Sequence, residues 1–424
     1  MQTFSLCTIG CRLNQYETEA AGAKLQALGF QEVAFGEPAE LCIINTCSVT
    51  ARADADARKA LRRARRSAPQ GRIVLTGCYA SAFRAELEAS GDADLLVDNR
   101  DKEQLVARLV EAFGCTLPPA AARNGTPRQR LVRHHTRAMV KIQDGCQEAC
   151  SYCIIPRARG RERSRPLQEV VAEVRTLEAA GYKEVVLTGV HAGKYRHEGH
   201  RLSDLLAALL RDTRVAQIRL SSLEPRELRP ALVDLITHEP RVCPHLHIPL
   251  QSGHDGVLRR MRRSYDSAWV EGLFARLQAA RADLALGTDV MAGFPGETEA
   301  QFQTTVAFLQ NLPLAYLHVF SYSDRPGTEA ERLGHKVPED AVRARGRELR
   351  ELGAQLRKRY YSKFVGRTLP VLVEQRRQAA TGRLLGLTGN YLRVLTDGPD
   401  HWMNQIVHLK IERLEGDFAL ATAA

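Results

Sequence analysis

The sequence has no apolar run of the roughly 18 to 20 residues that a helix needs to span a bilayer. Its first residues, MQTFSLCTIGC, carry neither a basic n-region nor a long apolar core. We therefore expect a cytoplasmic protein with no membrane partner. Low-complexity tracts and long internal repeats are also missing. With 44% hydrophobic and 26% charged residues, the composition excludes a collagen-like, mucin-like or mostly disordered chain.

The composition also indicates a class of partner and a type of cysteine chemistry. The 60 basic and 49 acidic residues give a net charge of +11, which favours a polyanionic partner, most simply a nucleic acid. The length of 424 residues, at about 150 residues per domain, predicts two to three domains. Ten cysteines in a reducing compartment indicate metal ligation or redox chemistry rather than a disulfide framework.

The pattern of apolar residues divides the chain into four segments. Residues 1–115 alternate short apolar runs with helical stretches, which predicts a doubly wound parallel α/β domain. Residues 116–137 contain proline, glycine and arginine but no acidic residue, which predicts a basic linker. Residues 138–360 alternate six apolar runs with helices, which predicts a partial (β/α)6 barrel with its chemistry at the carboxyl ends of the strands. Residues 361–424 predict a small β-barrel.

The strongest local signal is a group of three cysteines, Cys146, Cys150 and Cys153, directly after an expected strand. Three thiolates from one loop can hold a [4Fe-4S] cluster and leave one iron open. An open iron suits S-adenosylmethionine, whose amino and carboxylate groups can chelate it. Structural zinc is the alternative, but zinc prefers four protein ligands and the sequence has no second C-x2-C pair.

A second group of cysteines follows three expected strands of the first segment: Cys11, Cys47 and Cys78. The carboxyl ends of parallel strands meet at one edge of a sheet, where open α/β folds bind ligands. This placement favours a second iron–sulfur cluster. The alternative is three small buried apolar side chains, the commonest state of free cysteine. The other four cysteines are expected to be structural or incidental: Cys7, Cys42, Cys115 and Cys243.

Segments along nearly the whole chain resemble the radical S-adenosylmethionine methylthiotransferases: TIGCRLNQYETE, INTCSVTARAD, LTGCYA, KIQDGCQEACSYCIIPRARGRERSR, LTGVHAGKY, SSLEP, HIPLQSG and DVMAGFPGET. The C-terminal stretch is similar to a TRAM RNA-binding barrel. The opening and the LTGVHAGKY segment are most similar to the branch that modifies N6-threonylcarbamoyladenosine at tRNA position 37. The branches that act on isopentenyladenosine or on a ribosomal protein usually open with GCQMN or GCAKN.

The resemblance implies a tRNA-modifying enzyme with two [4Fe-4S] clusters. The cysteines at 146, 150 and 153 would hold the radical-generating cluster, and those at 11, 47 and 78 the auxiliary cluster. One S-adenosylmethionine would yield a 5′-deoxyadenosyl radical that removes hydrogen from C2 of the adenine, and another would supply the methyl group of the product, 2-methylthio-N6-threonylcarbamoyladenosine. The implied partners are tRNA, an electron donor such as flavodoxin or ferredoxin, and a sulfur source.

Further residues near strand ends or glycine turns are candidates for binding S-adenosylmethionine: Tyr152, Thr188, Gly189, Val190, Glu224, Gln251, Gly293 and Gly296. Ordinary structural roles stay open for all of them, such as a tight turn after Thr188, a helix cap at Glu224 or Gln251, and packing at Tyr152. Thr298 and Gln301 predict a helix capping box and need no further role.

Basic residues near the cysteine loop and the LTGVHAGKY segment are candidates for RNA binding: Arg157, Arg159, Arg161, His191 and Lys194. The arginines would meet phosphates, and all five residues could meet the carboxylate of the threonylcarbamoyl group. The alternatives are a packed histidine and a solvated lysine. Arg345 is expected on a solvated helix face, and Tyr391 and Trp402 of the terminal barrel are expected to stack on bases or to be buried.

Two rival functions stay open at this point. The first is a nucleic-acid-binding protein with zinc or structural iron–sulfur sites and no catalysis, which metal analysis would separate from an enzyme with about eight irons per chain. The second keeps the chemistry but changes the substrate to isopentenyladenosine in tRNA or to an aspartate of a ribosomal protein.

Overall fold

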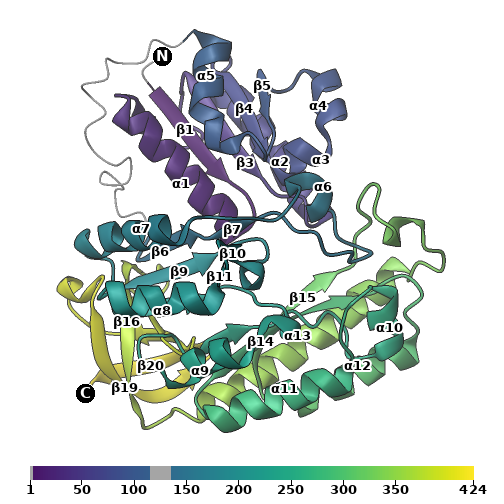
Figure 1. The fold of residues 1–424 in the computed structure, drawn as a ribbon, viewed down its shortest axis with the longest axis vertical. Coiled ribbons are helices and arrows are strands. Elements are labelled where there is room, and N and C mark those ends of the chain that lie inside the picture. Colours follow the sequence, from purple (N-terminus) through teal and green to yellow (C-terminus); the bar gives the residue numbers. More distant parts are fainter. Residues whose placement is uncertain (1–2, 115–134) are drawn as a thin grey trace. The chain divides into compact units, whose positions relative to one another are not determined.

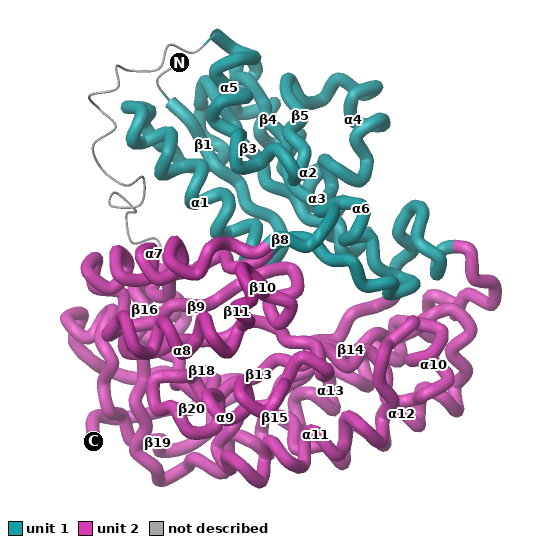
Figure 2. Tube along the Cα trace, viewed as in Figure 1, with its two compact units in different colours: residues 1–134, 144–163, 323–331 teal, residues 135–143, 164–322, 332–424 magenta. Residues whose placement is uncertain are grey.

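The computed structural model describes residues 3–114 and 135–424. These residues form two compact units, which Figure 2 colours separately. Unit 1 comprises residues 1–134, 144–163 and 323–331, and unit 2 comprises residues 135–143, 164–322 and 332–424. Cys115 and most of the expected linker lie outside the described residues. The units interleave along the chain, and the expected domain boundaries stay predictions.

A five-stranded parallel sheet forms the centre of unit 1 (Figure 1). In spatial order its strands are β2 (Gln31–Val33), β1 (Thr3–Thr8), β3 (Leu41–Thr46), β4 (Arg72–Gly77) and β5 (Leu95–Val97). The helices of the unit are α1 (Arg12–Ala27), α2 (Ala51–Ser67), α3 (Cys78–Ala82), α4 (Arg84–Ser90), α5 (Leu105–Phe113) and, from the later segment, α6 (Ile155–Arg159). All neighbouring strands pair in parallel.

Helices cover both faces of this sheet. Leu25 of α1 and Leu109 of α5 belong to one apolar core with Phe4 of β1. Leu61 of α2 belongs to a second core with Ile44 of β3. Two cores on opposite faces of a parallel sheet define a doubly wound arrangement, so the fold class predicted for the N-terminal segment is confirmed.

Unit 2 contains a partial barrel of six parallel strands, as the sequence predicts. The strands are β6 (Arg137–Lys141), β9 (Glu184–Thr188), β12 (Gln217–Leu220), β13 (His245–His247), β14 (Ala285–Ala292) and β15 (Leu314–Ser321). They form two three-stranded sheets, β12-β9-β6 and β13-β14-β15, joined by a parallel bridge between Ile218 and Val242. The helices are α7 (Leu167–Ala179), α8 (Leu202–Asp212), α9 (Pro230–His238), α10 (Asp255–Arg260), α11 (Ser267–Ala280), α12 (Glu299–Asn311) and α13 (Glu339–Ser362).

Short elements connect this framework. The strands β7 (Gln143–Asp144) and β8 (Arg163–Ser164) form a two-stranded sheet, and β10 (Arg196–His197) and β11 (His200–Arg201) form an antiparallel hairpin. The predicted capping box at the start of α12 is confirmed, since Thr298 and Gln301 exchange hydrogen bonds between side chain and backbone. Among the described residues, no helix is both long and apolar enough to cross a membrane.

The chain ends in a closed five-stranded barrel, which confirms the predicted small β-barrel. Its strands in spatial order are β16 (Thr368–Arg377), β17 (Leu384–Thr388), β18 (Arg393–Thr396), β20 (Phe418–Ala423) and β19 (Ile406–Glu415). Within unit 2, Arg219 of β12 pairs with Glu184 of β9, Nε to Oε1 at 2.7 Å, and donates to the carbonyl of Gly389 at 2.9 Å. This fully buried arginine therefore ties the terminal barrel to the six-stranded one.

Candidate cluster and cofactor sites

Three cysteines of unit 1 occupy equivalent places on three adjacent strands. Cys11 is the N-cap of α1, Cys47 directly follows β3, and Cys78 is the first residue of α3 after β4. The loops that carry them approach closely, because a Cβ added at Gly10, whose φ is +108°, would lie 2.4 Å from Cβ of Cys47. A side chain at position 10 would collide with Cys47, so glycine suits this turn. The predicted convergence at the carboxyl edge of the sheet is thus present.

The surroundings of these sulfurs disfavour a free thiolate. Burial raises the pKa of Cys47 to about 12, the Val49 backbone N–H lowers it, and the charges of Cys78 and Cys11 raise it further. A free thiolate is therefore costly at Cys47, whereas a bound metal would stabilise it. Three thiols that influence one another in this way suit a soft metal such as the iron of an iron–sulfur cluster.

Arg159 of α6 is buried beside this group, with a relative exposure of 1%. Its Nε donates to Sγ of Cys78 at 3.3 Å. Its terminal nitrogens donate to Glu17 at 3.0 Å and to Asp144 at 2.9 Å. We predicted a phosphate contact from this arginine, but in this position its guanidinium is enclosed by protein acceptors and not open to a phosphate.

A lysine completes the buried network on the other side of Glu17. Lys102 Nζ donates to the Glu17 carboxylate at 2.7 Å and to the side-chain oxygen of Asn45 at 3.0 Å. Glu17 therefore lies between two cations, Arg159 and Lys102. Burial lowers the pKa of Lys102, and the charge of Glu17 raises it.

The second group of cysteines lies in the loop between β7 and α6. The loop is closed at its base by a hydrogen bond from the Cys146 backbone N–H to the Gly160 carbonyl, at 3.1 Å. The backbone N–H of Glu148 donates to Sγ of Cys146 at 3.4 Å, and that of Cys153 to the Cys150 carbonyl at 3.1 Å. All three thiols are partly exposed, as a site that admits a small molecule requires.

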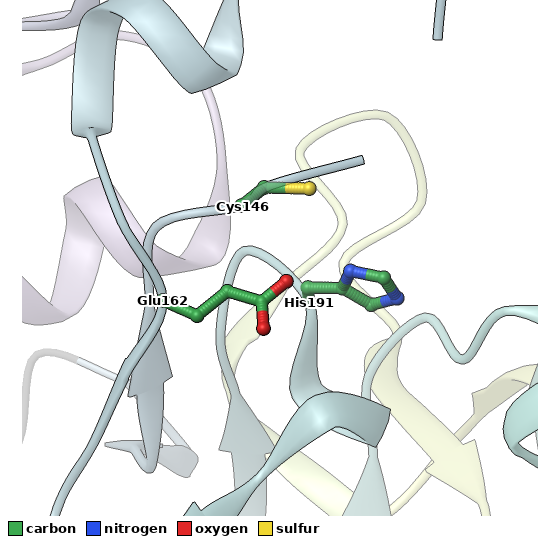
Figure 3. Close-up of side chains that lie close together, drawn as sticks. All are labelled: Cys146, Glu162 and His191. Carbon is green, nitrogen blue, oxygen red and sulfur yellow. The ribbon is translucent and has the colours of Figure 1, made fainter. Parts of the chain in front are cut away.

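Two features hold the start of this loop. Gly145 has a φ of +76°, and a Cβ there would lie 2.0 Å from the carbonyl oxygen of Arg161, so glycine is required. Glu162 lies near Cys146 (Figure 3), with its carboxylate within 4.8 Å of Sγ, and it accepts the Gln147 backbone N–H at 3.3 Å. The loop that carries Cys146, Cys150 and Cys153 is therefore shaped by contacts within unit 1.

The end of β9 carries the residues of the LTGVHAGKY segment. Gly189 packs on Gln143, whose side-chain oxygen accepts the His191 backbone N–H at 2.8 Å. The His191 ring, labelled in Figure 3, is buried, and its Nε2 lies 2.6 Å from Oε1 of Glu227. Burial raises the pKa of Glu227, while His191 lowers it. His191 is thus held by an acidic partner, and Lys194 is exposed.

Other predicted cofactor residues also follow strands of unit 2. Glu224 caps the short helix η4 (Pro225–Glu227) and pairs with Arg263, and its contact with S-adenosylmethionine stays a prediction. Gln251 has a left-handed φ of +74°, and its backbone pairs with β14 through a hydrogen bond to the Asp289 carbonyl at 2.8 Å. A non-glycine residue in this conformation is strained, and such residues cluster at functional sites.

The glycine motif after β14 is braced by a buried ion pair. The Gly293 backbone N–H donates to Oε2 of Glu297 at 2.9 Å, and Nη1 of Arg345 donates to the same oxygen at 2.9 Å. The expectation that Arg345 lies on a solvated face is wrong, since its relative exposure is 6%. The structure therefore adds Arg345 to the residues that shape this turn, which also contains Gly296.

The remaining candidates for RNA contact differ in exposure. Arg157 is exposed and donates to the carbonyl of Pro326, and Arg161 is exposed. In the terminal barrel, Tyr391 stacks on His245 with ring centroids 4.1 Å apart, and Trp402 packs against the barrel core. These two rings are partly buried, as the alternative to base stacking expects.

Two family models match the chain. The Radical SAM superfamily matches residues 140–309, and the Uncharacterized protein family UPF0004 matches residues 3–98. The threonylcarbamoyladenosine tRNA methylthiotransferase MtaB of Bacillus subtilis (strain 168) is 36% identical over 97% of this chain and 94% of its own. The MtaB of Aquifex aeolicus (strain VF5) is 36% identical over 92% of this chain and 96% of its own.

Relatives of another branch and a solved structure are also similar. The tRNA-2-methylthio-N(6)-dimethylallyladenosine synthase of Anaplasma marginale (strain St. Maries) is 32% identical over 86% of this chain and 83% of its own. The radical S-adenosylmethionine methyltransferase TsrM of Kitasatospora setae has a TM-score of 0.58 at 18% identity, covering 78% of this chain and 77% of its own. The likeness to TsrM shows a shared fold.

The chain is a radical S-adenosylmethionine enzyme that modifies tRNA, because the Radical SAM model matches its six-stranded barrel and relatives named for tRNA modification match it over nearly its whole length. More narrowly, it belongs to the radical S-adenosylmethionine methylthiotransferases. Members of this family use an iron–sulfur cluster and S-adenosylmethionine, which the thiol-rich loops of unit 1 fit. Membership excludes the alternative of a non-catalytic nucleic-acid-binding protein.

Sequence reasoning missed the partners that hold the site. Glu17 and Asp144 accept hydrogen bonds from Arg159, and Lys102 donates to Glu17, yet each stands in the sequence as an ordinary charged residue. Arg159 itself lies in a run with Arg157 and Arg161, and the run carries no mark of which side chain turns inward. The burial of Ala158 and Arg159 and the exposure of Arg157 are visible in the structure and not in the sequence.

Proposed function

We propose that this enzyme adds a methylthio group to C2 of N6-threonylcarbamoyladenosine at position 37 of tRNA. The product is 2-methylthio-N6-threonylcarbamoyladenosine. The observation that carries the proposal is the 36% identity to two relatives named for that substrate, over more than nine-tenths of each chain. The segments GCRLNQYETE and LTGVHAGKY support the same branch.

Two [4Fe-4S] clusters are part of the proposal. Cys146, Cys150 and Cys153 would hold the radical-generating cluster, and the residues of the other cysteine group would hold the auxiliary cluster: Cys11, Cys47 and Cys78. With these clusters bound, one S-adenosylmethionine would supply a 5′-deoxyadenosyl radical, and another would supply the methyl group of the methylthio group. An electron donor such as flavodoxin or ferredoxin and a sulfur source complete the reaction.

The chain's own residues would bind and orient the clusters and S-adenosylmethionine. Arg159 places a hydrogen-bond donor on the Cys78 sulfur and neutralises Glu17 and Asp144, which would otherwise be buried anions. The Arg345–Glu297 pair fixes the Gly293 backbone, where close approach of a cofactor needs an open main chain. The proposed S-adenosylmethionine contacts are those named from the sequence: Tyr152, Thr188, Gly189, Val190, Glu224, Gln251, Gly293 and Gly296.

The RNA contacts of the proposal are narrower than the sequence suggests. Arg157 and Arg161 are exposed and would meet phosphates. Lys194 is exposed and would meet the carboxylate of the threonylcarbamoyl group, while His191 is held by Glu227 and would position the turn that carries Lys194. A base at position 37 lies in a single-stranded loop, so an enzyme can take it out of the stack at moderate cost.

A side-by-side assay tests the substrate. The anaerobically reconstituted enzyme is given tRNA carrying threonylcarbamoyladenosine and tRNA carrying isopentenyladenosine, and the nucleosides are analysed by mass spectrometry. We expect methylthiolation of the first alone. Turnover of the isopentenyl tRNA alone would place the enzyme in the branch of the Anaplasma marginale relative and contradict the substrate, but not the family.

A further inference from the structure

Three side chains of unit 2 converge on adjacent strands away from the cysteines. His247 ends β13, Asp289 lies in β14, and His318 lies in β15. Nε2 of His247 is 2.9 Å from Oδ1 of Asp289, and Nδ1 of His318 is 3.3 Å from the same oxygen. The two imidazole rings stack with centroids 5.0 Å apart. None of these side chains belongs to the sites described above.

The sheet register explains the convergence. Asp289 is paired with His318 across β14 and β15, and His247 is paired with Gly287, two residues before Asp289. Residues two apart on a strand share a face, so the three side chains point to one side of the sheet. The alternate residues Leu246 and Val290 belong to the apolar core on the other side. The cluster is therefore a polar patch on the face opposite that core.

The separations are compatible with a metal ion bound between the three side chains. Metal–nitrogen and metal–oxygen bonds of about 2.1 Å place neighbouring ligand atoms roughly 3.0 to 3.4 Å apart in octahedral or tetrahedral sites. The observed values are 2.9 and 3.3 Å, and one ligand atom from each residue lies within 4.8 Å of the others. Two imidazoles and one carboxylate form a ligand set that binds divalent transition metals.

A neighbouring tyrosine holds the first ligand. The Tyr316 hydroxyl lies 3.1 Å from Nδ1 of His247, which leaves Nε2 facing Asp289, and it also lies 2.8 Å from Nε2 of His245. Ligating histidines in metalloproteins are oriented by such a partner on the second ring nitrogen.

We propose that His247, Asp289 and His318 bind one divalent transition-metal cation. Three protein ligands leave coordination positions for water or for an oxygen ligand. The His318 side chain is 51% exposed, so an ion can reach the site from solvent. The site needs none of the cysteines and does not depend on the proposed tRNA substrate.

Mn²⁺ is the probe of choice, because it prefers oxygen ligands such as carboxylate and water over thiolates and therefore avoids the cysteines. The holoenzyme with oxidised clusters, which are silent in electron paramagnetic resonance, is titrated with Mn²⁺ under anaerobic conditions. We expect one tightly bound Mn²⁺ per chain, with nitrogen couplings from two imidazoles in electron–nuclear double resonance. Asp289→Asn and His318→Gln should each weaken binding about tenfold or more, and Tyr316→Phe should weaken it by a factor on the order of ten.

A matched control lies in the same unit. His238 and Asp234 on α9 form a pair with Nδ1 and Oδ1 3.0 Å apart, but on an exposed surface. His238→Gln should leave Mn²⁺ binding unchanged. Because His318 is largely exposed, His318→Gln should fold normally, as circular dichroism and the cluster absorption can check. Absence of stoichiometric binding, absence of nitrogen coupling, or equal binding by His318→Gln would each overturn the proposal and leave only a hydrogen-bonded cluster.

Discussion

Arg159 is the residue of unit 1 whose loss should reduce the free energy of unfolding most. Its guanidinium donates hydrogen bonds to Glu17, Asp144 and the Cys78 sulfur, and the relative exposure of the residue is 1%. Arg159→Met would leave two carboxylates buried without their main cation, and removal of one partner from a buried pair costs roughly 3–5 kcal/mol. A probe placed in unit 1 of the full chain, monitored during unfolding in urea, measures the loss in the free energy of unfolding.

The neighbouring Arg161 is the control for that substitution. It is exposed, so Arg161→Met should change the free energy of unfolding by no more than about 0.5 kcal/mol. Arg159→Lys keeps the charge but not the forked geometry, and should fall between the two. Equal stability of the Arg159 and Arg161 variants would show that the buried network does not support the unit.

Arg161 itself should matter for RNA. If it meets a phosphate, Arg161→Ala should reduce the slope of log K for tRNA against log salt by about one. Arg211 on α8, which pairs with Asp212 on the surface, is an exposed arginine outside the cysteine loop and serves as the comparison. Equal changes in slope at both positions would indicate a diffuse basic field rather than a phosphate contact at Arg161.

At the scale of elements, the two cysteine groups should each account for half of the bound iron. Replacing Cys146, Cys150 and Cys153 with alanine should leave about four of about eight irons and abolish cleavage of S-adenosylmethionine. Replacing Cys11, Cys47 and Cys78 should also leave about four irons but retain cleavage. Iron analysis and product chromatography after anaerobic reconstitution measure both. Full iron content in the second variant would refute the auxiliary cluster.

A buried arginine contributes to the link between the two barrels of unit 2, because Arg219 pairs with Glu184 in the six-stranded barrel and donates to the Gly389 carbonyl of the terminal barrel. Arg219→Met leaves the buried Glu184 without its cation. This change should lower the free energy of unfolding, measured by heat or urea, by roughly 3–5 kcal/mol. The double variant Arg219→Met with Glu184→Leu removes both charges and should recover most of that loss. If the double variant were as unstable as the single one, the contacts of Arg219 with the terminal barrel would dominate instead.

Periodic features were predictable from the sequence, whereas the contacts between side chains that are distant in the sequence were not. The βα alternation placed Cys11, Cys47 and Cys78 after successive strands, and the parallel sheet then had to bring them to one edge. Nothing local distinguished Arg345 from the exposed arginines of its helix, because its partner Glu297 lies 48 residues away. His247, Asp289 and His318 likewise meet only through the register of three strands, which one sequence does not specify.

At the scale of the whole molecule, the net charge and the length matched by relatives both indicate a tRNA substrate. A net charge of +11 suits a tRNA substrate, and relatives named for tRNA modification match nearly the entire chain. The tRNA-modifying relatives therefore share the sheet of unit 1 and both barrels of unit 2 with this chain. The substrate branch is the central claim.

Nucleoside analysis of total tRNA from a strain that lacks this gene tests that claim most directly. We predict that 2-methylthio-N6-threonylcarbamoyladenosine disappears, that N6-threonylcarbamoyladenosine accumulates in its place, and that the gene restores the methylthio form while a Cys146→Ala version does not. Unchanged levels of 2-methylthio-N6-threonylcarbamoyladenosine, together with loss of the methylthiolated isopentenyl nucleoside, would contradict the account.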